Sequence, residues 1–391
     1  MKSHIPSLIT AILWRVFSYG ALLGVLALSV HVYLSYPLYI KKIPYFSSAL
    51  RAGFSIQCDA AAPPELRSML RRVSLPFFSL TGQVLLVDSD GQVAACQVGD
   101  KAATEAFRFA SMTKVLTAFA VLDLVQQGKV DLHKPVLHYF LEVNPTRLTD
   151  PNVANITLWH LLNHSSGLGG PFGSDKMDRP GETPWCPYTI EALEGVRLAG
   201  APGSNHLYSN VAYCLAGEVI TRTVGVDYQT YMEQTYLHAY PSLRFVHGDY
   251  EPSEPEYDLS NDWNFDRDYV HKLDFHALAP AAGLMGRADE FALLVQSLLE
   301  RNPEIMYAEP IEICGPGHGQ RCYSYAFQII ETEQGRVALQ GGYLPGASSL
   351  VAINKQGEVL VWTAAGAALE GKHRQAMMNR VVAFLTQRGS P

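Results

Sequence analysis

The chain has 391 residues, 48% of them hydrophobic, and a formal net charge of -7 at pH 7. This is enough apolar material for one large domain or two closely packed ones. The negative net charge and the lack of any long Lys/Arg run argue against a nucleic-acid partner, and we predict none.

The N-terminal region contains a long apolar run. Residues 16–40 carry no Asp, Glu, Lys or Arg, and Lys41 and Lys42 follow directly. A run of this length crosses a bilayer with some tilt, and it is long for the apolar part of a cleaved signal. A buried helix of a soluble protein is the alternative. We predict an N-terminal tail (1–15), an anchor in the inner, cytoplasmic membrane (16–40), a linker (41–75) and one extracytoplasmic domain (76–390).

Six cysteines are spread along the chain, at Cys58, Cys96, Cys186, Cys214, Cys314 and Cys322. Their spacing matches no zinc-finger pattern, and sequence alone does not decide how six cysteines pair. The segment CGPGHGQRC is short and Gly-rich, so a Cys314–Cys322 disulfide would close a small loop there. Buried free thiols are the alternative.

Turn residues and apolar periodicity predict the elements of the N-terminal half. Residues 82–99 form two apolar runs around Asp90-Gly91, which predicts a β-hairpin. The run RFASMTKVLTAFAVL then predicts a helix that ends near Gly128. A short helix follows in ITLWHLLNHSSGL and ends at Gly167, before a Gly/Pro-rich loop over residues 169–205.

The C-terminal half returns from helices to strands. The sequence predicts a helix that begins at Tyr208. Residues 249–274 are predicted to form a solvated acidic loop that borders the pocket, and ADEFALLVQSLLE is predicted to form an amphipathic helix. Four strand-like runs and a last helix over 371–388 complete the chain. We predict an α+β fold, in which both chain ends build an antiparallel sheet flanked by helices, with an inserted helical region and the active site between the two parts.

The first candidate for chemistry is the Ser-x-x-Lys pattern at Ser111 and Lys114. Residues three apart share a helix face, so the amine reaches the hydroxyl. A serine is a weak nucleophile until a base takes its proton, and Lys114 can do this if it is neutral or coupled to another base. A serine cap beside a surface lysine is the ordinary alternative.

Two later segments strengthen this pattern. HLYSNVAYCLAGEVI places Tyr208 two residues before Asn210, and LQGGYLPGASSL places Gly341-Gly342 at the end of a strand. With Ser-x-x-Lys, these three signatures in this order resemble the serine β-lactamase and penicillin-binding protein family, most closely its class C and esterase-like branch. The resemblance covers residues 75–388, and ITLWHLLNHSSGL, APGSNHLYSN and AAGLMGRADEFALL are similar to the family as well.

The resemblance implies catalytic roles for four residues. Ser111 is expected to be the nucleophile. Lys114 and Tyr208 are expected to form the base pair, in which a charged Lys114 favours tyrosinate, and Tyr208 then protonates the leaving group. Asn210 is expected to orient the substrate or Lys114.

The same resemblance implies a substrate-binding strand. The backbone N–H groups of Ser111 and Tyr343 are expected to form the oxyanion hole, and Gly341 and Gly342 to let substrate lie against the strand. Gln340 departs from the family, which has Lys or His at this position. Glutamine donates hydrogen bonds but carries no charge, so we expect weaker binding of a substrate carboxylate there.

Two histidines are weaker candidates for a functional site. His160 and His164 lie four apart, as a metal pair would, but no acidic residue stands between them in the zinc-protease arrangement. We predict a structural role for both, and no metal or organic cofactor.

We therefore predict a serine hydrolase that works through an acyl-enzyme. Its substrate is expected to be a small molecule: a β-lactam, as for a β-lactamase, or a related D-Ala-type amide. One alternative is an esterase or peptidase of the same fold that acts on small acyl esters or peptides. Another is a non-catalytic envelope sensor that binds a β-lactam or cell-wall peptide.

Overall fold

The computed structural model describes residues 5–35, 52, 54–74, 79, 81–99, 104–169, 177, 179, 181–257, 272–306, 323–366 and 371–388. The chain divides into two compact units, Met1–Ser47 and Ser48–Pro391.

The described part of the first unit, residues 5–35, forms the helix α1 (Ile5–Ser35). Within it Trp14–Ser35 is long and apolar enough to cross a membrane, and these side chains are not buried. The predicted tail (1–15) is helical from Ile5 onward, and the helix continues through Arg15, which is a good helix former. The division into tail and anchor stays a prediction. Residues 36–40 of the predicted anchor lie outside the described residues.

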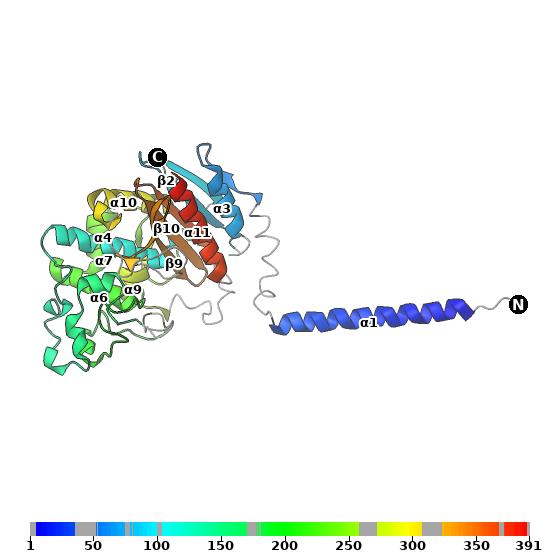
Figure 1. Ribbon diagram of the computed structural model, residues 1–391, viewed down its shortest axis with the longest axis horizontal. Helices are drawn as coiled ribbons and strands as arrows, with labels where there is room; N and C mark the ends of the chain where they lie inside the picture. The colour runs from blue at the N-terminus through cyan, green and yellow to red at the C-terminus, as the bar shows by residue number, and fades with distance from the viewer. Residues whose placement is uncertain are drawn as a thin grey trace. The chain divides into compact units, whose positions relative to one another are not determined.

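The second unit is built on an eight-stranded antiparallel sheet in the order β1-β3-β2-β11-β10-β9-β8-β7 (Figure 1). The strands are β1 (Gln57–Cys58), β2 (Thr81–Val87), β3 (Val93–Val98), β7 (Tyr323–Ser324), β8 (Phe327–Thr332), β9 (Gly335–Leu344), β10 (Ala347–Asn354) and β11 (Val359–Ala365). N-terminal strand β2 pairs with C-terminal strand β11 along its length. The predicted sheet from both chain ends is therefore confirmed, as is the hairpin β2–β3, whose turn contains Gly91 at a φ of 77°.

Helices α3 (Pro64–Ser74) and α11 (Gly371–Arg388) lie side by side on one face of this sheet (Figure 1). Helix α3 buries apolar side chains spaced by three and four residues, at Leu66, Met69, Leu70 and Val73, as an amphipathic helix does. The predicted linker over 41–75 was therefore wrong for β1 and α3. Both belong to the domain, and the disulfide Cys58–Cys96 joins β1 to β3.

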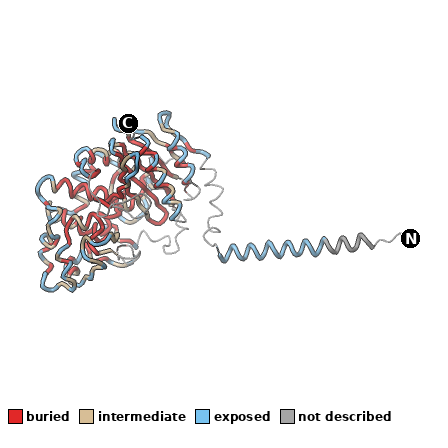
Figure 2. Tube along the Cα trace, viewed as in Figure 1, coloured by how far each residue is buried: buried red, intermediate tan, exposed pale blue. Residues whose placement is uncertain are grey.

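The other face of the sheet carries the helical region: α4 (Thr113–Gln126), α5 (Leu158–Leu162), α6 (Asn210–Val224), α7 (Tyr228–Met232), α9 (Phe275–Ala282) and α10 (Ala288–Arg301). Short turns connect them, at Ala110–Met112, Val136–His138, Pro145–Arg147, Pro151–Asn155, Ile190–Gly195, Glu233–Leu237 and Pro303–Met306. Helix α4 is buried on all sides from Thr113 to Leu124 and forms the centre of the larger core (Figure 2). An apolar helix without a polar face is typical of such a position.

A small second sheet leads into α4. It has the order β4-β6-β5, from β4 (Phe107–Arg108), β6 (Leu284–Gly286) and β5 (Arg244–Phe245). The start of the acidic segment is held against β4: Arg108 Nε lies 2.7 Å from Glu254 Oε2, and both side chains are almost fully buried. Arg108 N also donates to Tyr257 Oη at 3.0 Å. The predicted solvated loop is therefore held against β4 at Glu254 and Tyr257, although Asp249 and Glu256 beside them are exposed. Residues 258–271 lie outside the described residues.

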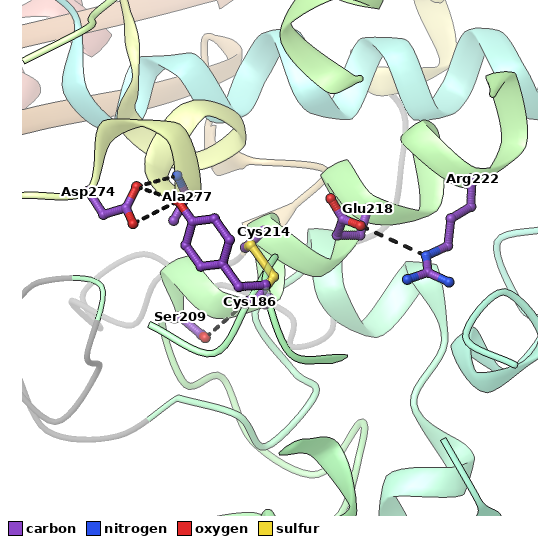
Figure 3. Close-up of a disulfide and its surroundings, with 9 residues drawn as sticks. Cys186, Ser209, Cys214, Glu218, Arg222, Asp274 and Ala277 are labelled. Atoms are coloured by element: carbon purple, nitrogen blue, oxygen red, sulfur yellow. Dashed lines mark hydrogen bonds and ion pairs between the residues drawn. A yellow bond between two sulfur atoms is a disulfide. The ribbon is translucent and has the colours of Figure 1, made fainter. Parts of the chain in front are cut away.

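A second disulfide, Cys186–Cys214, joins the predicted Gly/Pro-rich loop to α6. Figure 3 shows it beside the beginning of α6, close to Ser209. The predicted Cys314–Cys322 bridge lies outside the described residues.

Candidate active site

Ser111 lies at a sharp turn between β4 and α4, in the short helical turn Ala110–Met112. Ala110 has a φ of 50°, in the left-handed region that residues other than glycine rarely adopt. The turn is held from behind by Thr113, whose hydroxyl donates to Ala110 O at 2.7 Å and accepts from Leu284 N at 3.0 Å. The fold thus fixes the backbone of Ser111 and leaves its side chain half-buried at the start of α4.

Lys114 is fully buried one turn into the same segment. Its Nζ donates to Ser111 Oγ at 3.2 Å, to Asn210 Oδ1 at 2.6 Å and to the carbonyl of Ala281 at 2.9 Å. Three acceptors match the three N–H groups of an ammonium. This arrangement favours the protonated lysine, which makes Lys114 a fixed positive charge beside Ser111.

Tyr208 approaches Ser111 from the segment that leads into α6. Its Oη donates to Ser111 Oγ at 2.7 Å, and Lys114 Nζ lies 4.8 Å from the centre of its ring. Ser209 begins α6 as its N-cap, with its side chain accepting from Ala212 N. The helix therefore starts directly after Tyr208, with Asn210 in its first turn. The predicted Tyr-x-Asn signature and Ser-x-x-Lys signature meet at one hydroxyl.

Cys214 lies one helical turn beyond Asn210 in α6, and Figure 3 shows its disulfide with Cys186. Both of its residues are buried. It attaches the loop around Cys186 to the part of α6 that carries Asn210. The bridge therefore stabilises the helix that carries Asn210 and follows Tyr208.

Strand β9 passes close to the backbone of Ser111. A Cβ on Gly342 would lie 2.2 Å from Phe109 O, 2.2 Å from Ser349 Oγ and 3.2 Å from Ser111 N. Only glycine permits this approach. A Cβ on Gly341 would meet nothing nearer than 3.9 Å. Strand β9 thus brings Gly342 beside the backbone of Ser111. The oxyanion hole expected from the N–H groups of Ser111 and Tyr343 stays a prediction.

Gln340 lies in β9 two residues before Gly342 and is 1% exposed. Its Nε2 donates to the carbonyl of Ser111 at 3.1 Å, and Tyr323 Oη donates to its Oε1 at 3.4 Å. Its amide therefore supports the backbone of Ser111. Another element provides a cation near the end of β9. The guanidinium of exposed Arg374, on α11, lies 5.3 Å from the centre of the Tyr343 ring.

The two candidate histidines occupy different environments. His160 Nδ1 accepts from the Thr157 backbone N–H, which completes a capping box at the start of α5. His164 is fully buried and packs against Tyr208, with ring centres 4.2 Å apart. Within the described ranges, no group of three His, Cys, Asp or Glu residues is arranged to hold a metal ion. The contact of His164 with Tyr208 was missed, because nothing local in the sequence indicates a partner more than forty residues away.

The family model described as Beta-lactamase matches residues 80–391 of this chain. The chain belongs to the beta-lactamase family. Among curated relatives, the putative fimbrial assembly protein FimD, serogroup D, of Dichelobacter nodosus is 29% identical over 359 residues, covering 89% of this chain and 90% of that protein. Esterase EstB of Burkholderia gladioli is 33% identical over 165 residues, covering 37% of this chain and 42% of the esterase.

A solved structure supports the beta-lactamase fold. The D-amino acid amidase of Ochrobactrum anthropi SV3 superposes with a TM-score of 0.63 at 20% identity, covering 82% of this chain and 98% of the amidase. At this identity the likeness shows the fold. Together with the family match it supports a serine hydrolase, in agreement with the predicted fold class and family.

Proposed function

We propose that this protein is a membrane-anchored serine hydrolase that acts through an acyl-enzyme on a β-lactam ring or a related D-Ala-type amide. One observation carries the proposal: Ser111 Oγ lies within hydrogen-bond distance of both Lys114 Nζ and Tyr208 Oη. Tyr208, as tyrosinate, can accept the proton of the Ser111 hydroxyl, and the Lys114 ammonium supplies a positive charge beside both groups.

Tyr208 is the proton carrier in this proposal, because Lys114 already has an acceptor for each ammonium N–H. Tyrosinate, favoured by the nearby positive charge, takes the proton from Ser111 as Oγ bonds to the substrate carbonyl carbon. The carbonyl oxygen becomes an oxyanion that accepts from the N–H groups of Ser111 and Tyr343. When the bond to the leaving nitrogen or oxygen breaks, Tyr208 returns the proton to that atom.

Hydrolysis of the acyl-enzyme repeats these steps with water. Tyr208 accepts a proton from water as the water oxygen bonds to the acyl carbon. The bond to Ser111 Oγ then breaks, and Oγ recovers a proton from Tyr208. Asn210 holds Lys114 in place through both halves of the reaction, and Gly341 and Gly342 leave space for the substrate backbone along β9.

An esterase that acts on small neutral acyl esters is the second candidate function. The buried and uncharged Gln340 favours it, because this residue offers no cation to a substrate carboxylate. The partial similarity to esterase EstB favours it as well. Arg374 favours the first candidate, because it brings a cation to Tyr343 from α11.

We propose that the domain lies on the extracytoplasmic side of the inner membrane, anchored by α1. The apolar stretch Trp14–Ser35 supports the anchor. Two disulfides in the described part of the domain support an oxidising compartment. The relation to a putative fimbrial assembly protein is consistent with work at the cell envelope.

The proposal is tested on the full-length protein with a panel of β-lactams, D-Ala-D-Ala peptides and neutral acyl esters. Intact mass detects the acyl-enzyme, and product formation is followed in parallel. We expect covalent adducts with turnover for amides, and Tyr208→Phe should slow adduct formation by about 10²–10⁴-fold. Turnover of esters alone would establish the esterase instead, whereas stable adducts without turnover would indicate a sensor. Absence of any adduct would overturn the acyl-enzyme proposal.

A further inference from the structure

His164 contacts three consecutive residues at the tip of the Tyr-x-Asn signature. Its carbonyl accepts from Leu207 N at 2.6 Å, and its Nδ1 accepts from Ser209 N at 3.2 Å. Its ring packs against that of Tyr208. The residues on both sides of Tyr208, and Tyr208 itself, are therefore fixed by one side chain and one carbonyl that come from the segment after α5.

The backbone of His164 is shaped for this contact. Its φ is 54°, in the left-handed region where a β-carbon is strained. Asparagine is the residue other than glycine that adopts this conformation most readily. A strained residue that is fully buried and makes three contacts with one turn indicates that the surrounding structure holds it there.

The hydrogen bond from Ser209 also defines the state of the imidazole. Because Nδ1 accepts from a backbone N–H, the ring proton is on Nε2, which is buried without a hydrogen-bond partner among the described residues. A charged imidazolium would need a proton on Nδ1 and would lose this contact. Burial holds the pKa of His164 well below its usual range, and the charges of Lys114 and His206 act in the same direction.

The other groups that face His164 are aromatic rings, His206 among them, and the Lys114 ammonium. Tyr208 and Tyr213 approach from α6 and the turn before it, Tyr323 from β7, and His206 from the loop before Tyr208. Lys114 lies behind Tyr208 and Tyr213, with Nζ 4.8 Å and 5.3 Å from their ring centres. None of these side chains supplies an acceptor for Ser209 N, so the position of that amide depends on His164.

We propose that His164 is a positioning residue, whose neutral imidazole holds the Tyr208–Asn210 turn so that Tyr208 Oη stays on Ser111 Oγ. This rests on the proposed role of Tyr208 in acylation. A shift of about 1 Å in a reacting group lowers a rate by roughly a hundredfold. Loss of the Ser209 contact is therefore expected to slow acylation, while noncovalent substrate binding is unchanged.

Two variants distinguish the effect of losing the hydrogen-bond acceptor for Ser209 N from the effect of losing the imidazole ring. His164→Gly and His164→Asn both tolerate the left-handed backbone and both lose the ring, but only asparagine keeps an acceptor, Oδ1, for Ser209 N. We expect His164→Gly to acylate Ser111 about a hundredfold more slowly, and His164→Asn to recover most of that loss. Tyr213→Phe is the matched control in the same cluster, since its hydroxyl donates to the carbonyl of Leu162, which also accepts from Ala326 N. It should acylate at nearly the wild-type rate.

Hydrogen exchange at Ser209 N–H is measured in the same proteins, with Leu207 N–H as the internal reference. We expect faster exchange at Ser209 in His164→Gly than in His164→Asn. Equal acylation rates and equal exchange in the two variants would overturn the proposal and leave His164 a packing residue. If His164→Gly does not fold, His164→Phe, which keeps a ring and lacks the acceptor, must acylate slowly. If the wild type itself forms no adduct, the proposed function fails, and Ser209 exchange still decides whether His164 holds the turn.

Discussion

Asn210 Oδ1 on α6 accepts a hydrogen bond from Lys114 Nζ on α4 at 2.6 Å. This contact connects the two halves of the site, because Lys114 also reaches Ser111 and Asn210 follows Tyr208 by two residues. The ammonium is buried, so each acceptor around it compensates for water that it has lost. Asn210 is therefore expected to fix the charge that favours tyrosinate.

Asn210→Ala should slow acylation without unfolding the domain. Hydrogen bonds to charged groups are worth about 1.5–3 kcal/mol, which corresponds to roughly ten- to a hundredfold in rate if the transition state uses the contact in full. The measurement is the rate of adduct formation by intact mass. Asn205→Ala, an exposed asparagine in the preceding loop, is the control and should be unchanged. Equal rates in both variants would show that Asn210 is dispensable for Lys114.

Gly342→Ala and Gly341→Ala form a matched pair in β9. A Cβ at position 342 would lie 2.2 Å from two oxygen atoms near Ser111, whereas one at 341 would lie 3.9 Å from its nearest neighbour. Overpacking of this kind costs about 1–3 kcal/mol or more. Gly342→Ala should lower Tm by several degrees and prevent acylation of Ser111, and Gly341→Ala should keep the wild-type Tm. A Gly342→Ala protein with normal stability and acylation would contradict the close approach of β9 to Ser111.

The neutral His164 predicts how stability depends on pH. In the unfolded chain this histidine takes up a proton near pH 6.5, whereas in the folded protein burial first, then the charges of Lys114 and His206, keep its pKa well below that. The unfolded state therefore binds more protons below pH 6.5, and the free energy of unfolding falls there by up to about 1.4 kcal/mol per pH unit for this group. Above pH 6.5 the group has no effect.

Denaturant unfolding of wild type and His164→Asn at pH 7.5, 6.5 and 5.5 measures this contribution. The wild type should lose more stability between pH 6.5 and 5.5 than the variant does. His160, whose pKa is also lowered by burial, is present in both proteins and cancels. Parallel pH curves for the two proteins would mean that folding does not lower the pKa of His164.

The sequence was sufficient where local pattern determines structure. Residues three apart on one turn placed Lys114 on Ser111, Asp90-Gly91 placed the β2–β3 hairpin, and apolar spacing placed α4, α6 and α10. The pattern of α3 was equally readable at Leu66, Met69, Leu70 and Val73, but the prolines before it favoured a linker. Their effect ends at the first turn of the helix, where proline is tolerated.

Contacts between segments that lie far apart in the chain could not be predicted from the sequence. The disulfide Cys186–Cys214 depends on how a loop folds back on α6, and the Arg108–Glu254 pair on how the acidic segment packs against β4. The same holds for His164, whose three contacts lie at residues 207–209. Gln340 was recognised as a departure from the family, but its bond to the Ser111 carbonyl follows only from the packing of β9.

The central claim is that Ser111 carries the acyl group, and peptide mapping of the adduct tests it most directly. Wild type and Ser111→Ala are each incubated with the panel member that gives the strongest adduct, digested, and analysed by mass. The account predicts that the acyl mass is found on the peptide containing Ser111, and that Ser111→Ala keeps the wild-type Tm, forms no adduct and loses activity by on the order of 10³-fold or more. The same adduct and turnover in Ser111→Ala, or an acyl mass on another peptide, would contradict it.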